Sequence, residues 1–211
     1  MILGSFAVIT ADIVKSREKD ILSEKITSKI DKFDCSELAI PFSVSRGDEL
    51  QGVIDKPYNI AKVIRKLRYF VKPLKLHVGV GIGEIDKTEL QEARSSWDLN
   101  GNTFIKARDA LDIAKKSKLY KTVVITGDKF TETCVNTILL LLDSLESEWT
   151  EKQWEAVHVY ESAGTYEKAS KTLGSTIQNI QQHCSSAKWS LVRETEEKLE
   201  LLFKELYKKQ F

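Results

Sequence analysis

The sequence predicts an α+β protein in which a sheet-containing part is followed by a purely helical part. Short apolar runs typical of strands alternate with amphipathic helical patterns as far as residue 127. Beyond that point apolar residues recur only at helical spacing. We therefore expect a sheet domain over residues 1–127, a connecting helix over 128–148 and a helical domain over 149–211.

The composition excludes several classes of protein. Hydrophobic residues make up 42% of the 211 residues and charged residues 30%, which predicts a packed core rather than a disordered chain. Thirty-two basic residues balance thirty-one acidic ones, so no global field attracts nucleic acid or a membrane. The longest apolar run, Ile138–Leu142, is far shorter than the about 20 residues that span a bilayer. We expect no membrane contact.

The cysteine pattern points to a reducing compartment. Cys35, Cys134 and Cys184 are odd in number, lie far apart and form no closely spaced pair. Such spacing is typical of reduced thiols and excludes a disulfide scaffold or a zinc finger. The N-terminus carries no basic region followed by a long apolar stretch, as a secretion signal would. These features predict a cytoplasmic protein.

The elements of the sheet domain follow from apolar runs and their spacing. Strand patterns occupy residues 6–11, 38–45, 50–54, 74–83 and 122–126. Amphipathic helical patterns occupy residues 21–33, 60–70 and 104–114. Gly47-Asp48 separates the second and third strands and indicates a hairpin. The order strand, helix, hairpin, helix, strand is the ferredoxin-like βαββαβ plan, here with an appended αβ unit.

The helical half carries clear signals for where helices start and stop. We expect the connecting helix, which includes Ile138–Leu142, to be buried on several sides. Thr150 and Gln153 have the spacing of a capping box at the start of the next helix. Gly164-Thr165 ends that helix and caps another. The last helix, with apolar residues from Leu199 to Leu206, pairs with a second subunit in a homodimer or packs back on its own chain.

Three carboxylates of the sheet domain are candidates for a metal site. Asp12 ends the first strand, and Asp48 and Glu49 lie at the hairpin. Because the first strand lies beside a hairpin strand in this plan, these acids converge at one sheet edge. Oxygen ligands of this kind suit Mg²⁺ or Mn²⁺ together with a phosphate-bearing substrate. The alternative is that Asp12 caps a turn and that Gly47-Asp48 is only a turn pair.

These residues also carry a resemblance to known enzymes. Asp12, the segment Arg46–Leu50 and the glycine-alternating segment Val78–Gly83 resemble the palm domain of GGDEF diguanylate cyclases and class III nucleotide cyclases. Ala107–Lys115 resembles the A-x-x-A-L-x-x-A-K segment that follows the GGDEF strands. Arg46 stands in place of the first glycine of GGDEF. The resemblance implies metal ligation by Asp12 with Asp48 or Glu49, and nucleotide contacts from Arg46, Gly47 and Lys115.

The segment Thr165–Ile180 has helix-turn-helix spacing. Ala169 is small where two helices cross and Gly174 supplies the turn, as in region four of bacterial sigma factors, which this segment resembles. The resemblance implies base contacts from the polar residues Thr176, Gln178, Asn179, Gln181 and Gln182, and phosphate contacts from Lys168 and Lys171. The alternative is a protein-docking or dimerising bundle.

The whole chain resembles the SatD family. The resemblance rests on Ile9–Arg17, Arg46–Gln51, the glycine-alternating strand, Gly101–Ala110 and the C-terminal helix-turn-helix. The leading hypothesis is a DNA-binding transcriptional regulator whose cyclase-like palm senses a nucleoside triphosphate through Mg²⁺. The second is a nucleotide cyclase or nucleotidyltransferase with two metals held by Asp12 and by Asp48 or Glu49. The third is a non-catalytic interaction protein.

Overall fold

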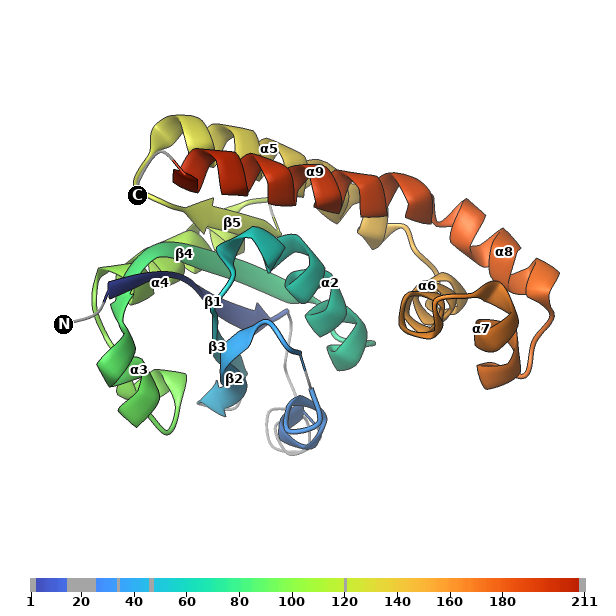
Figure 1. Ribbon diagram of the computed structural model, residues 1–211, viewed down its shortest axis with the longest axis horizontal. Helices are drawn as coiled ribbons and strands as arrows, with labels where there is room; N and C mark the ends of the chain where they lie inside the picture. The colour runs from blue at the N-terminus through green and yellow to red at the C-terminus, as the bar shows by residue number, and fades with distance from the viewer. Residues whose placement is uncertain (1–2, 15–25, 34, 46–47, 120, 209–211) are drawn as a thin grey trace.

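The computed structural model describes residues 3–14, 26–33, 35–45, 48–119 and 121–208. Five strands form one mixed sheet with helices on both faces, and a group of helices extends from one side of it (Figure 1). Among the described helices, none combines the length and the apolar character needed to cross a membrane.

The five predicted strands are confirmed. They are β1 (Leu3–Ile13), β2 (Leu38–Ser45), β3 (Glu49–Ile54), β4 (Leu76–Asp86) and β5 (Thr122–Ile125). Their order in the sheet is β2-β3-β1-β4-β5. The first four strands pair antiparallel, while β5 joins β4 in parallel. The strand β1 is longer than predicted at both ends, and Asp12 is its last residue but one.

The helices of the sheet part lie on both faces of the sheet. They are α2 (Ile60–Val71), α3 (Lys87–Glu92) and α4 (Asn102–Lys116), with 3-10 turns η1 (Pro57–Asn59) and η2 (Ser96–Asp98), and residues 26–30 are also helical. Because side chains alternate along a strand, Ile9 of β1 faces the cluster that contains Ile64 of α2. Val8 faces the opposite cluster, which contains Ala107 of α4.

The alternating glycines of β4 let α4 lie directly on the sheet. A Cβ atom at Gly79 would lie 2.3 Å from the carbonyl oxygen of Ala107, and one at Gly81 would lie 2.1 Å from that of Thr103. Gly83 meets the side chain of Thr103 in the same way, at 2.7 Å from its Oγ1. Gly79 and Gly81 therefore accommodate the backbone of α4, and Gly83 accommodates a side chain of that helix.

The predicted helical half is found after β5. Its helices are α5 (Lys129–Ser147), α6 (Glu151–Ala163), α7 (Tyr166–Thr172), α8 (Ile177–Ser186) and α9 (Trp189–Lys208). The capping box of Thr150 and Gln153 is formed at the start of α6. Gly164 ends α6 with a φ of 75°, and Thr165 caps α7 by accepting from the backbone N–H of Lys168.

The connecting helix α5 is buried along one side only. Val135, Leu139 and Leu142 are buried, whereas Leu141 is 62% exposed. The expectation of burial on several sides is therefore wrong, because α5 covers the β5 side of the sheet and keeps its other side open to solvent (Figure 1).

The last helix returns to the sheet part. Figure 1 shows α9 running from α8 back alongside α5. It contacts α5, α2 and η1, and its residues Leu199 and Phe203 are buried. The apolar side of α9 was expected either to pair with a second subunit or to pack on its own chain. In the structure it packs on its own chain. One continuous core extends from Ile9 of β1 to Ile180 of α8.

Candidate functional site

Asp12 and Glu49 face each other across two neighbouring strands. They are register partners in the antiparallel pair of β1 and β3, and side chains of directly opposed residues lie on the same face, with Cβ atoms about 5 Å apart. The carbonyl oxygen of Asp48 accepts a hydrogen bond from the backbone N–H of Ile13 at 3.3 Å, which ties the hairpin to the end of β1. The structure thus brings the three predicted carboxyl-bearing residues to one edge of the sheet.

Lys115 of α4 lies against this group of carboxylates. It lies in the last turn of α4, and its Nζ is 2.9 Å from Oδ1 of Asp12. Burial acts to lower the pKa of Lys115, but the hydrogen bond to Asp12 and the negative charges of Asp12, Glu49 and Asp48 outweigh it and raise the pKa. The side chain of Lys115 is 39% exposed, so this ion pair is screened by water and its cation can be exchanged for another.

Arg108 is a second cation of the site, to which the sequence analysis assigned no role. It precedes Lys115 by seven residues, or two helical turns, and therefore lies on the same side of α4. Its NH1 is 3.5 Å from Oε2 of Glu49. The seven-residue spacing was the available signal, but it became meaningful only once α4 was placed over the sheet.

The face of the sheet beneath these charges is polar. Thr10 and Gln51 are register partners one step further along β1 and β3, and both are buried. On the other side of β1, His77 of β4 is the register partner of Asp12. Burial and the charge of Lys121 lower the pKa of His77, while Asp12 acts in the opposite direction. A neutral imidazole therefore borders the carboxylates.

The surface of α8 presents the amides that the sequence predicts for DNA contacts. Gln178, Asn179, Gln181 and Gln182 are all exposed. Thr176 is exposed too, but its hydroxyl caps α8 by accepting from the backbone N–H of Asn179 at 3.2 Å. Lys168 and Lys171 are exposed on α7, where Lys171 pairs with Glu167 at 2.7 Å. The inner sides of these helices meet through buried Ala169 and Ile180.

Comparison with known proteins identifies the family. The model of the SatD family matches residues 2–210. The chain belongs to the SatD family. No curated protein and no solved structure gave a significant match to this SatD chain.

The sheet edge of the SatD chain has the donor set for a magnesium-bound phosphate ligand. Mg²⁺ is usually held by one or two carboxylates together with phosphate oxygens of a ligand, and the facing acids Asp12 and Glu49 fit that requirement. Within the described part of the chain, no three His, Cys, Asp or Glu side chains form a cluster that would enclose a metal by itself. The bound ion would supply positive charge between the carboxylates and the phosphates. Lys115 and Arg108 are the cations that would face those phosphates.

Two predicted residues of the site fall outside this description. Arg46 and Gly47 of the hairpin lie outside the described residues of the SatD chain. The described site therefore comprises Asp12, Asp48, Glu49, Arg108 and Lys115.

Proposed function

We propose that this SatD family protein is a DNA-binding regulator that responds to a magnesium-bound nucleotide. The observation that carries the proposal is the joint placement of Asp12 and Glu49 with Lys115 and Arg108 at one sheet edge. Carboxylates suit the metal, and the two cations suit the phosphates. The ligand of this site would be a nucleoside triphosphate or a related nucleotide.

The sheet topology supports the palm part of the proposal. The order β2-β3-β1-β4 with antiparallel neighbours agrees with the proposed ferredoxin-like βαββαβ plan, in which α4 and β5 would be the added αβ unit. In the cyclases that the sequence resembles, the residues that match Asp12 and Lys115 serve the metal and the phosphates. Metal binding at Asp12 would replace its ion pair with Lys115 and free that ammonium group for a phosphate.

The arrangement of α6, α7 and α8 supports the DNA-binding part. These helices pack together around Trp154, Ala169 and Ile180, and Gly174 with a φ of 57° makes the turn between α7 and α8. Amides such as those of Gln178 and Gln181 can read adenine in the major groove. Residues 149–211 carry as many acidic as basic side chains, so affinity must come from two copies or from a bound ligand.

The helix α9 joins the helical part to the sheet part. It begins next to α8 and ends against the sheet part, where Phe203 is buried. A rigid helix of 20 residues transmits a change at one end to the other. A ligand that displaces α2 or α5 would thus alter the presentation of α8 through this helix.

The test of nucleotide binding is thermal unfolding with Mg²⁺ and each common nucleoside triphosphate. At about ten times the dissociation constant, mass action adds about 1.4 kcal/mol and raises the midpoint by about 3 to 5 °C. Asp12→Ala and Lys115→Gln should abolish this shift, while the matched surface variant Lys118→Gln should keep it. Absence of a shift with every triphosphate would contradict the proposal.

Two further readouts separate the remaining alternatives. Release of pyrophosphate that depends on Asp12 and Asp48 would identify the protein as a nucleotide cyclase or nucleotidyltransferase. A salt-dependent complex with DNA from its own operon, lost in the Gln178→Ala/Gln181→Ala variant, supports the regulator. Failure of nucleotide binding and DNA binding together would favour the non-catalytic interaction protein.

A further inference from the structure

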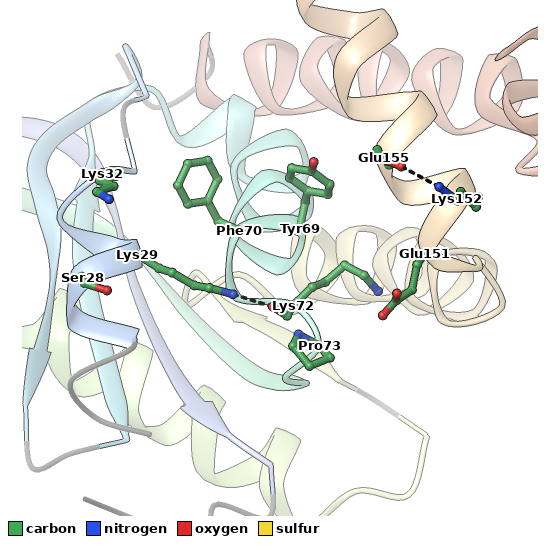
Figure 2. A pocket seen from close by; sticks show the side chains of 10 residues that line it. All are labelled: Ser28, Lys29, Lys32, Tyr69, Phe70, Lys72, Pro73, Glu151, Lys152 and Glu155. Carbon is green, nitrogen blue, oxygen red and sulfur yellow. Dashed lines mark hydrogen bonds and ion pairs between the residues drawn. The ribbon is translucent and has the colours of Figure 1, made fainter. Parts of the chain in front are cut away.

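A second hollow lies between the sheet part and the helical part, apart from the carboxylate site. It has a volume of about 730 Å³, which is in the range of small-molecule sites. Figure 2 shows that three segments distant in sequence form its walls. The lining residues are Ser28, Lys29, Lys32, Tyr69, Phe70, Lys72, Pro73, Glu151, Lys152 and Glu155.

The charge of this cleft is positive. Four of its ten lining residues are lysines and two are glutamates. Lys152 is paired with Glu155 at 3.6 Å. In contrast, Lys29, Lys32 and Lys72 have no described carboxylate within ion-pair distance. Figure 2 shows the ammonium groups of Lys29, Lys32 and Lys72 at separate points of the hollow, with that of Lys72 on the side of Glu151. The surplus of lysines over glutamates in the lining attracts an anion.

Two of these lysines are already held in position. Lys29 donates a hydrogen bond from Nζ to the carbonyl oxygen of Lys72 at 2.6 Å, across the cleft wall (Figure 2). The Nζ of Lys72 lies 5.3 Å from the ring centre of Trp154 on α6. Ordering a free lysine side chain on binding costs conformational entropy. That cost is smaller here, since the side chains are partly ordered beforehand.

The cleft also offers aromatic rings that are fixed from behind. Tyr69 stacks on His158 with ring centres 3.9 Å apart, and Phe70 meets Phe33 edge to face at 5.2 Å. Both rings line the hollow together with the lysines. A ligand that carries only negative charge would leave this apolar surface unused, whereas a ligand with a flat ring would cover it.

We propose that this cleft binds a phosphorylated small molecule that carries a flat ring. Lys29 contacts the phosphates, Lys32 and Lys72 add positive charge on either side of it, and the ring lies against Tyr69 and Phe70. The site needs no metal, because its ligands for phosphate are ammonium groups. The inference is independent of the carboxylate site, which lies on the α4 side of the sheet and contains other residues.

The test is a lysine footprint with ATP as the probe, in the presence of EDTA. Acetylation of each lysine is followed by mass spectrometry at increasing ATP. We expect Lys29, Lys32 and Lys72 to react about fivefold more slowly at saturation, since a bound phosphate masks the amine. The exposed residues Lys87 and Lys118 serve as internal controls. Lys115 reports the carboxylate site in the same sample, so the two sites are scored separately.

Variants and a second probe make the outcome decisive. Lys29→Gln/Lys72→Gln should raise the ATP concentration that protects Lys32 by about tenfold or more, and Lys87→Gln should leave it unchanged. Inorganic triphosphate should protect about tenfold less well than ATP, because it lacks the ring. Equal protection of cleft and control lysines overturns the proposal. Equal potency of the two probes refutes the role of the rings, and tighter protection by duplex DNA would make the cleft a nucleic-acid groove instead.

Discussion

Arg65 of α2 and Glu196 of α9 form a buried ion pair between residues that are 131 positions apart in the sequence. The Nε of Arg65 donates to Oε1 of Glu196 at 2.7 Å, and its two terminal nitrogens donate to the carboxylate of Glu161 on α6 at 3.0 Å. The side chain of Arg65 is only 2% exposed. Burial acts to lower its pKa, yet Glu196 and Glu161 outweigh burial and raise the pKa, so the guanidinium stays charged. The cluster fixes α6 and α9 to the sheet part.

Replacing Arg65 tests this attachment. Arg65→Met leaves Glu161 and Glu196 without their cation, and we expect the free energy of unfolding to fall by about 3–5 kcal/mol in urea titrations. Arg193→Met is the matched control, because Arg193 is exposed and its ion pair is with Glu197 on its own helix. The triple variant Arg65→Met/Glu161→Gln/Glu196→Gln should recover part of the loss. A midpoint of Arg65→Met equal to that of the wild type would show that the cluster does not form.

Replacing two glycines on one face of β4 by alanine should lower the free energy of unfolding by different amounts. Gly81→Ala places Cβ against the carbonyl oxygen of Thr103 and the backbone nitrogen of Ala107, so α4 must move. We expect a loss of about 3 kcal/mol or more, measured by urea unfolding. Gly83→Ala meets Oγ1 of Thr103, which donates a hydrogen bond to the carbonyl oxygen of Glu84. A side chain rather than the helix backbone must shift there, so the cost should be smaller, about 1–2 kcal/mol. Equal effects would mean that α4 does not lie so close to β4.

His158 predicts a loss of stability on mild acidification. Burial lowers its pKa from the ordinary 6.5, with Arg65 and Lys66 acting in the same direction and Glu161 against them. In the unfolded chain the imidazole of His158 binds a proton at a higher pH than in the folded chain. The free energy of unfolding therefore falls as the pH drops below about 6.5. His158→Phe keeps a ring against Tyr69. This variant should reduce the slope of the free energy of unfolding against pH between about pH 7 and 5. His77, whose pKa is also lowered, accounts for part of the slope that remains. An unchanged slope would contradict the assignment.

Two substitutions in α9 test whether this helix packs against the sheet part of its own chain. Phe203→Ala removes a buried ring that is 1% exposed, and we expect a loss of about 3–5 kcal/mol. Leu201→Ala, at a side chain that is 55% exposed, should change stability by less than about 0.5 kcal/mol. Urea unfolding at two protein concentrations gives both values. A dependence of the Phe203 effect on concentration would indicate that the helix pairs with a second subunit.

Part of the candidate site was predictable because strand pairing has few solutions. The order of strand patterns implied that β1 lies beside the hairpin, and the facing positions of Asp12 and Glu49 follow from that neighbourhood. The partner of Asp12 was not predictable in this way. Lys115 was expected to face phosphates, and its ion pair with Asp12 depends on how far α4 extends over the sheet. Arg108 was missed for the same reason.

The local features of this protein could be predicted from its amino-acid sequence. The capping box of Thr150 and Gln153, the turns at Gly164 and Gly174 and the alternation along β1 all depend on residues within a few positions of each other. In contrast, the packing of α9 on its own chain, the contacts of Arg65 with three helices and the cleft lined by lysines from three segments appear only in the folded molecule. Those relationships join residues far apart in the chain, and close packing of the whole molecule, rather than any local pattern, selects them.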